Sequence, residues 1–124
     1  MAKGKYVDGF LIPIPKKNTA AYLKMARAGC QAWKKFGALD YKECILDDAA
    51  PPFVALTFPK MARTKPGETV WFSFIVFKSK AHRNAVNKKV MDYFARKYGN
   101  EMSNDMPFDM KRFSVGGFKV LVSA

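Results

Sequence analysis

Hydrophobic residues concentrate in four short runs of this chain that have the composition of β-strands. The runs span residues 6–14, 39–46, 69–77 and 113–122. The run at 69–77 is apolar or aromatic at nearly every position, so neither of its faces could be left in water, and it is predicted to be a central strand. The run at 39–46 is the most polar of the four, which predicts an edge strand. Pro13 and Pro15 are expected to end the first strand, because proline supplies no backbone N–H to a ladder.

Two further segments repeat apolar residues at steps of three and four, which predicts amphipathic helices. The first follows Asn18, a favourable N-cap residue, and closes at Gly37. The second follows Ser79, also an N-cap residue, and closes at Gly99. In the last strand, the pair Gly116-Gly117 predicts either a bulge or a close approach of another group to the backbone.

The resulting order is βαββαβ, the order of ferredoxin-like folds. We expect a single domain over residues 1–124, of the α+β class, with a four-stranded antiparallel sheet and two helices on one face. The first and third strands would be central and the others would form the edges. The face that the helices leave open would carry either Val7 and Leu11 or Phe10 and Ile12, with large residues of the third strand beside them. A soluble monomer does not tolerate an exposed patch of this kind. The sequence therefore predicts a homodimer in which two sheets pack face to face.

The composition adds one outlier, a formal net charge of +12. Such a charge favours anionic partners, but the lysines and arginines are scattered and no nucleic-acid motif accompanies them. Nucleic acid is therefore the alternative partner rather than the first. No apolar run is long enough to span a bilayer and no secretory signal is apparent, which predicts a cytoplasmic protein with no membrane partner. Cys30 and Cys44 fit no metal-ligand spacing, so we expect free thiols, no metal site and no cofactor.

One connection is longer than a strand-to-strand link normally is. It covers residues 47–68 and contains four of the seven prolines. Its apolar residues Phe53, Val54, Leu56 and Phe58 are unusual for a free linker. We expect this segment to be a lid or an arm that packs over a pocket mouth or over a partner subunit.

Several segments together resemble a known family. They are Tyr6-Val-Asp-Gly-Phe10 with Pro13 and Pro15, Gly37-Ala-Leu39, Phe72-Ser-Phe-Ile-Val76 followed by Ser79-Lys-Ala81, and Met106-Pro-Phe-Asp-Met-Lys-Arg112 with Gly116-Gly-Phe118. The chain resembles the small bacterial YbaA-like family of unknown function. The resemblance implies a ferredoxin-like subunit of the dimeric α/β-barrel superfamily, whose two facing sheets close a barrel. It implies no activity, cofactor or catalytic residue.

Asp8 is the first candidate for a catalytic residue. It lies in a predicted central strand, on the face shared by Tyr6, Phe10 and Ile12, where an isolated carboxylate is costly to bury. Such an environment is one way in which a carboxylate becomes a general base toward an enolisable or phenolic substrate. The alternative is a structural carboxylate that backbone donors or a lysine satisfy.

Four other residues are candidates for ligand binding. Trp71 and Phe74 could line an aromatic cavity, although plain core packing explains them equally well. Asp109 and Arg112 could form part of a polar rim around that cavity, or could join a loop to the body of the domain or to a partner.

Two functional hypotheses follow, with a pocketless scaffold as a third. The first is a homodimer that binds a small molecule between the sheet and the helices or inside the barrel, either as a binding protein or as a cofactor-independent enzyme. Asp8 would be its polar anchor and residues 47–68 its lid. The alternative is a basic module that binds nucleic acid or another polyanion through lysines of the second helix. These are Lys80, Lys88, Lys89 and Lys97.

Overall fold

The computed structural model describes residues 5–99 and 106–124 and confirms the βαββαβ order. The main elements are β1 (Tyr6–Pro15), α1 (Thr19–Lys35), β2 (Asp40–Ile45), β3 (Glu68–Phe77), α3 (Lys80–Tyr98) and β4 (Ser114–Lys119). Three short helices lie in the described parts of the connections: η1 (Lys16–Asn18), α2 (Phe58–Met61) and η3 (Met110–Arg112). The described part of the chain contains no helix whose length and apolar content would let it span a bilayer.

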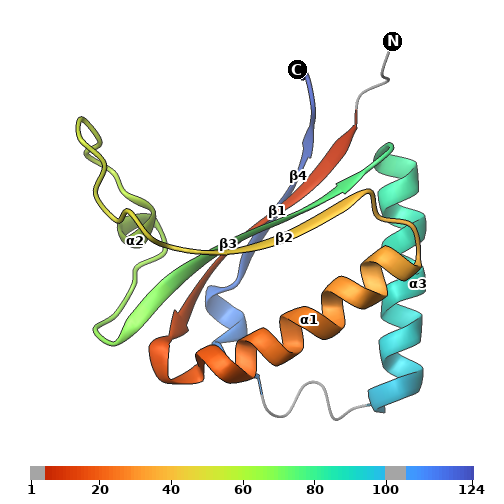
Figure 1. Cartoon of the computed structure of the whole chain (residues 1–124), viewed down its shortest axis with the longest axis horizontal. Coiled ribbons are helices and arrows are strands. Elements are labelled where there is room, and N and C mark those ends of the chain that lie inside the picture. Colours follow the sequence, from red (N-terminus) through yellow and green to blue (C-terminus); the bar gives the residue numbers. More distant parts are fainter. Residues whose placement is uncertain (1–4, 100–105) are drawn as a thin grey trace.

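The four strands form one antiparallel sheet in the order β2-β3-β1-β4. The apolar strands β1 and β3 are central and the polar strand β2 is an edge, as the sequence predicts. Helices α1 and α3 cover one side of the sheet (Figure 1). The fold is therefore the α+β, ferredoxin-like one that the element order indicates.

Strand β1 continues through Pro13 and ends at Pro15, so the expectation that the prolines end the strand is wrong for Pro13 only. The register explains why they are tolerated. Leu11 directs its carbonyl toward β4, where Ser114 Oγ donates to it, and alternate residues of a strand point their backbone groups to the same side. Pro13 and Pro15 therefore face the β4 side, but the β4 pairing with β1 ends at Leu11. No ladder bond is lost on that side.

The helix ends follow the predicted caps with one difference. Ser79 Oγ accepts a hydrogen bond from the backbone N–H of His82 at 3.0 Å, as an N-cap residue should. Gly37 follows α1 with φ of 110°, which glycine adopts without strain. Asn18 occupies the N-cap position of α1, but its side chain does not cap the helix. Its amide nitrogen instead donates to the carbonyl of Pro107 at 2.9 Å, which ties the start of α1 to the segment before η3.

The register sorts the side chains of the sheet into two faces. We call the side covered by α1 and α3 the helix face and the other side the open face. Cross-strand partners share a face. The helix face carries Tyr6, Asp8, Phe10, Ile12, Trp71, Ser73, Ile75 and Phe77. The open face carries Val7, Gly9, Leu11, Phe72, Phe74, Val76, Gly116 and Phe118.

The paired glycines of β4 allow close packing rather than a bulge. The β1–β4 register is continuous through Gly116 and Gly117. A Cβ on Gly117 would lie 2.5 Å from the hydroxyl of Tyr6, and a Cβ on Gly116 would lie 3.2 Å from the ring of Phe118. The glycines thus leave space for one aromatic ring on each face of the sheet. The strand itself ends at Lys119, three residues earlier than predicted.

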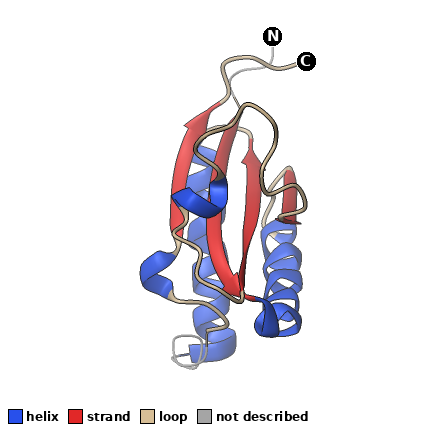
Figure 2. Ribbon diagram, turned by 90° about the vertical axis from the view of Figure 1, so that its left-hand side faces the viewer, coloured by secondary structure: helices blue, strands red, loops and turns tan. Residues whose placement is uncertain are grey.

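The long connection lies on the open side of the sheet. We call its residues 47–67 the arm. Helix α2 of the arm lies in front of the strands in Figure 2, with α1 and α3 behind them. Phe58 of α2 stacks on Phe72 of the open face, with ring centroids 6.3 Å apart. The arm therefore cannot be a lid for a cavity between the sheet and the helices, because it occupies the opposite face.

Candidate functional site

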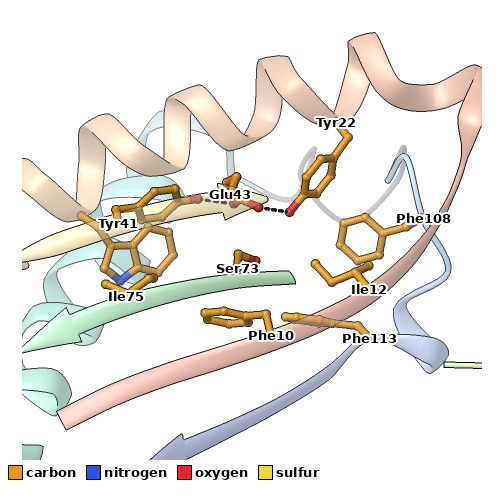
Figure 3. Close-up of a pocket in the computed structure, with 10 residues that line it drawn as sticks. Phe10, Ile12, Tyr22, Tyr41, Glu43, Ser73, Ile75, Phe108 and Phe113 are labelled. Atoms are coloured by element: carbon orange, nitrogen blue, oxygen red, sulfur yellow. Dashed lines mark hydrogen bonds between the residues drawn. The ribbon is translucent and has the colours of Figure 1, made fainter. Parts of the chain in front are cut away.

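A small cavity lies between the helix face of the sheet and α1, and its volume is about 110 Å³ (Figure 3). Aromatic and aliphatic side chains form most of its wall, and Glu43 and Ser73 add polar groups. The described residues that line it are Phe10, Ile12, Tyr22, Trp33, Tyr41, Glu43, Ser73, Ile75, Phe108 and Phe113. A wall of this kind, largely apolar with a few convergent polar groups, is typical of small-molecule sites.

The alternation of β2 explains how a carboxylate reaches this cavity. Tyr41 and Glu43 are two residues apart, so both point to the helix face, where they lie opposite Ile75 and Ser73 of β3. Tyr22 comes from the buried stripe of α1, directly above the strand. The helix thus brings Tyr22 to Glu43, which is 21 residues away in the sequence, and the edge strand places Tyr41 beside them.

Glu43 accepts hydrogen bonds from both tyrosines. The Tyr22 hydroxyl donates to Glu43 Oε1 at 2.7 Å, and the Tyr41 hydroxyl donates to Glu43 Oε2 at 2.6 Å. Each carboxylate oxygen keeps acceptor capacity for a further donor. We call Glu43, Tyr22 and Tyr41 the carboxylate–phenol cluster.

Both phenols in the cluster stay protonated at neutral pH. Burial raises the pKa of Tyr22 well above its ordinary value, and the hydrogen bond to Glu43 raises it further. Burial likewise raises the pKa of Tyr41, and the negative charge of Glu43 adds to that shift. The two hydroxyls therefore act as donors that hold the carboxylate in a fixed orientation at the cavity wall.

These raised pKa values predict the behaviour of the protein in base. Near pH 11, the phenolate absorbance of the folded protein should fall short of that of the unfolded chain by two of the five tyrosines. Because an unfolded chain releases these protons near pH 10 and the folded protein keeps them, the free energy of unfolding should fall as the pH rises above about 10. Glu43→Gln should lower both pKa values. Full ionisation of all five tyrosines in the folded protein near pH 10 would contradict the cluster.

Asp8 is buried, but it lies against α3 rather than in this cavity. The residue is 3% exposed, and Arg83 Nη1 donates to its Oδ1 at 2.7 Å. The amide nitrogen of Asn87 lies 3.3 Å from its other oxygen. Arg83 also stacks its guanidinium over the ring of Tyr6. An arginine and an asparagine, rather than the lysine or backbone donors considered from the sequence, satisfy this carboxylate.

Asp8 is nevertheless connected to the cavity wall through one intermediate. Asn87 donates to Asp8 through its amide nitrogen and accepts a hydrogen bond from Trp33 Nε1 at 2.9 Å. Trp33 lines the cavity, whereas Asp8 does not. A catalytic role for Asp8 stays a prediction, and Glu43 is the carboxylate that contacts the cavity directly.

The candidate ligand-binding residues are not brought together. Trp71 points to the helix face, where its ring packs against Tyr22 with centroids 4.9 Å apart. Phe74 points to the open face, since it is an odd number of positions away along the same strand. Trp71 is thus part of the core beside the cavity, and Phe74 belongs to the opposite surface.

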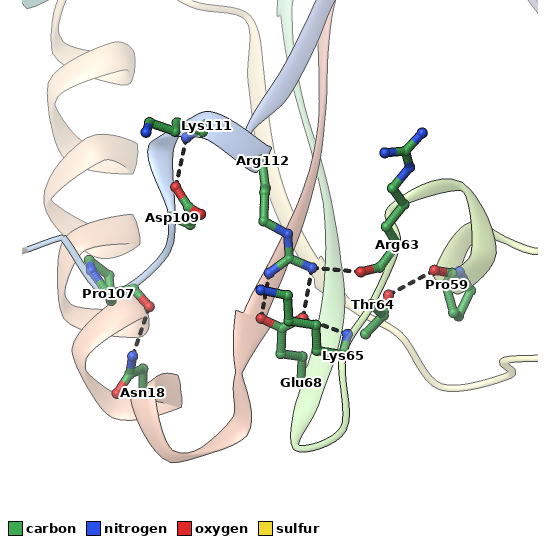
Figure 4. Close-up of polar contacts among 10 residues, drawn as sticks. All are labelled: Asn18, Pro59, Arg63, Thr64, Lys65, Glu68, Pro107, Asp109, Lys111 and Arg112. Atoms are coloured by element: carbon green, nitrogen blue, oxygen red, sulfur yellow. Dashed lines mark hydrogen bonds and ion pairs between the residues drawn. The ribbon is translucent and has the colours of Figure 1, made fainter.

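Asp109 and Arg112 serve different local contacts (Figure 4). Asp109 accepts from the backbone N–H of Lys111 at the start of η3. Arg112 makes two hydrogen bonds to the carboxylate of Glu68, at 2.6 and 2.8 Å, and donates to the carbonyl of Arg63 at 2.7 Å. The positive charge of Arg112, through these hydrogen bonds, lowers the pKa of Glu68. Arg112 therefore joins η3 to β3 and to the arm.

Other candidate groups are dispersed over the surface. Among the described residues, no three His, Cys, Asp or Glu side chains converge as a metal site would require. Cys30 is half-buried and Cys44 is exposed, and both are free thiols. Lys80, Lys88, Lys89 and Lys97 are exposed on α3, and Lys88 pairs with Asp92 at 3.5 Å. Their role in binding a polyanion stays a prediction.

Sequence reasoning did not identify Glu43 as a site residue. The segment from 39 to 46 was interpreted as a polar edge strand, and its charges as protection against stray pairing. The available signal was the spacing Tyr41-x-Glu43, which puts a phenol and a carboxylate on one face of a strand. Nothing in that spacing indicates that the face is the one covered by helices, or that Tyr22 would join it.

The sheet order and the two helices define the class of the protein as ferredoxin-like, and solved structures agree. A dimeric ferredoxin-like protein from an uncultured marine organism matches with a TM-score of 0.58 at 8% identity, over 98% of this chain and 100% of the other. A protein of unknown function from Nitrosomonas europaea also has a TM-score of 0.58, at 11% identity, over 100% and 96%. A protein from Bacillus cereus, proposed to be an antibiotic-biosynthesis monooxygenase, has a TM-score of 0.54 at 8% identity, over 98% of both chains.

Within this class, the chain belongs to the family described as "Protein of unknown function (DUF1428)", whose model matches residues 5–110. It is 37% identical over 118 residues to the uncharacterized protein YbaA of Escherichia coli strain K12, which covers 95% of this chain and 97% of the relative. YbaA of Shigella flexneri matches to the same extent. The resemblance to the YbaA-like family is thus confirmed, and the chain spans nearly the full length of its relatives.

Proposed function

We propose that this protein is a homodimer that binds a small molecule in the cavity beside Glu43. The observation that carries the proposal is the carboxylate–phenol cluster, in which two phenol hydroxyls orient one carboxylate at the wall of an aromatic cavity. Placing a carboxylate at a half-buried position is costly, and the hydrogen bonds from the two phenols offset part of that cost. Pre-oriented polar groups in an apolar wall are what fixes the orientation of a small ligand.

The cavity favours a small flat ligand that carries a hydrogen-bond donor. Its aromatic walls suit a ring, and its volume of about 110 Å³ limits an unopened site to a molecule no larger than a single ring. Glu43 is the one charged residue among the described residues that line it. A neutral or cationic O–H or N–H compound would bind to the free acceptor sites of Glu43, and an anion would be repelled.

If the protein is an enzyme, Glu43 is the group that could take a proton from the bound ligand. A general base must lie within hydrogen-bond reach of the proton that it abstracts, and Glu43 lines the cavity that would hold the ligand. The two phenol hydroxyls would remain hydrogen-bonded to Glu43 during the proton transfer and would keep its carboxyl group in the same orientation. Chemistry of this kind would need no cofactor.

Small aromatic probes test the proposal. We expect phenol and aniline at millimolar concentration to shift the NMR signals of residues that line the cavity, and we expect no such shift from benzoate. Glu43→Gln should weaken aniline binding about tenfold, because a hydrogen bond to a charged acceptor is replaced by one to a neutral acceptor. Asp92→Asn is the matched control, since it removes the same charge from the exposed face of α3. Binding of benzoate as tight as that of aniline, or no shift with either donor probe, would rule out the proposed site.

The open face supports the homodimeric part of the proposal. Its large apolar side chains include Leu11, Phe72 and Phe118, of which Phe72 is 43% and Phe118 59% exposed. A continuous apolar surface of this kind marks an interaction site. One structural neighbour is described as dimeric, and isologous pairs are the most common oligomers.

A further inference from the structure

The arm presents apolar side chains that no described residue of the same chain covers. Phe53 is fully exposed, and Leu56 is 62% exposed. Phe53 also has φ of 69°, in the left-handed region that is strongly disfavoured for an aromatic residue. Backbone strain of this kind persists only where the surrounding structure imposes it, and it is concentrated at functional positions. The arm thus holds a strained phenylalanine out in solvent.

The base of the arm is fixed to the body of the domain, so the exposed tip is positioned rather than loose. Arg112 binds both oxygens of Glu68 and the carbonyl of Arg63, which fastens the returning end of the arm to η3 (Figure 4). Both partners of this ion pair are largely buried, with side-chain exposures of 19% and 11%. Thr64 Oγ1 adds a bond to the carbonyl of Pro59 at 2.9 Å.

The open face carries a groove of about 280 Å³ that the described residues leave unfilled. Its floor is the cross-strand pair Gly9 and Gly116, which lack side chains, and its sides include Leu11, Phe72 and Phe118. Phe58 is the arm residue that reaches it. Phe53 and Leu56 do not line this groove. Within the described part of one chain, the apolar tip of the arm therefore stays exposed and the apolar groove stays unfilled.

We propose that the arm is a clasp, in which Phe53 and Leu56 of each copy dock into the open-face groove of a second copy. The proposal rests on the homodimer proposed above and adds that each subunit completes the surface of the other. Phe58 of the arm lines the groove, so the arm and the groove lie on the same side of the sheet. A two-fold axis between facing sheets therefore makes the contact reciprocal. The groove walls are apolar, which suits these side chains and does not suit a polyanion.

Photo-crosslinking tests where the tip of the arm lies. The full chain with p-benzoylphenylalanine at position 53 would be mixed with an isotopically heavy copy, irradiated and digested. We expect crosslinks between the light arm and heavy peptides from β1 or β4. Crosslinks confined to peptides of the same copy would overturn the clasp.

The dissociation constant of the dimer tests what the clasp contributes. We expect the double variant Phe53→Ser, Leu56→Ser to raise it roughly tenfold or more, since buried aromatic anchors dominate interfaces. The matched control is Met91→Ser, which removes an exposed apolar side chain from α3. All these positions are exposed, so the variants should have the same circular dichroism spectrum as the parent protein. If the parent protein is a dimer and the arm variant has the same dissociation constant as the control, the clasp is ruled out while the homodimer stands. A monomeric parent protein would remove both the homodimer and the clasp.

Discussion

Replacing Arg83 with methionine should destabilise the fold by about 3–5 kcal/mol, because it leaves the carboxylate of Asp8 buried without a charged partner. Asp8 is 3% exposed, and Arg83 donates to it at 2.7 Å across the interface between β1 and α3. The remaining partner, Asn87 at 3.3 Å, is neutral and cannot compensate for a buried charge. Denaturant unfolding at a fixed protein concentration measures the change in the free energy of unfolding.

Two controls separate the loss of the ion pair from the loss of a long side chain. Lys88→Met on the same helix removes a cation from the exposed pair with Asp92, and should change the free energy of unfolding by less than about 1 kcal/mol. The double variant Asp8→Asn, Arg83→Met should recover part of the loss, because the uncompensated charge is gone. A cost for Arg83→Met no larger than that for Lys88→Met would show that Asp8 does not depend on Arg83.

The order of the elements could be predicted from the sequence because it depends on local patterns. The apolar run at 69–77 and the polar run at 39–46 assign a central and an edge strand without any knowledge of the rest. Ser79 caps α3 through a bond to His82, only three residues away. Such features need no information about distant contacts, so the composition and spacing of a short segment are sufficient to predict them.

The site could not be predicted, because it depends on contacts between distant segments. The partner of Asp8 is 75 residues away, and the partner of Tyr22 is Glu43 on a different element. Whether Phe10 or Leu11 faced the helices was left open by the alternation alone, and the register of the sheet decides it. The same register separates Trp71 from Phe74 and lets β1 run through Pro13.

The open face gives the second large effect. Phe118→Glu should convert the proposed dimer into a monomer, with a dissociation constant raised at least a hundredfold. Facing sheets would bury the new carboxylate in an apolar interface and, through the two-fold axis, introduce it twice. The fold itself should persist, because Phe118 is 59% exposed on the edge strand β4. Sedimentation equilibrium of the parent and the variant measures the change.

The matched control for this variant is Met91→Glu. Met91 is 53% exposed and lies on α3, which covers the other side of the sheet. A carboxylate there adds the same charge to the protein without entering the proposed interface, so the dimer should be retained. Equal dissociation of the two variants would attribute the effect to the added charge rather than to the open face. Retention of the dimer in Phe118→Glu would mean that the two copies meet through another surface.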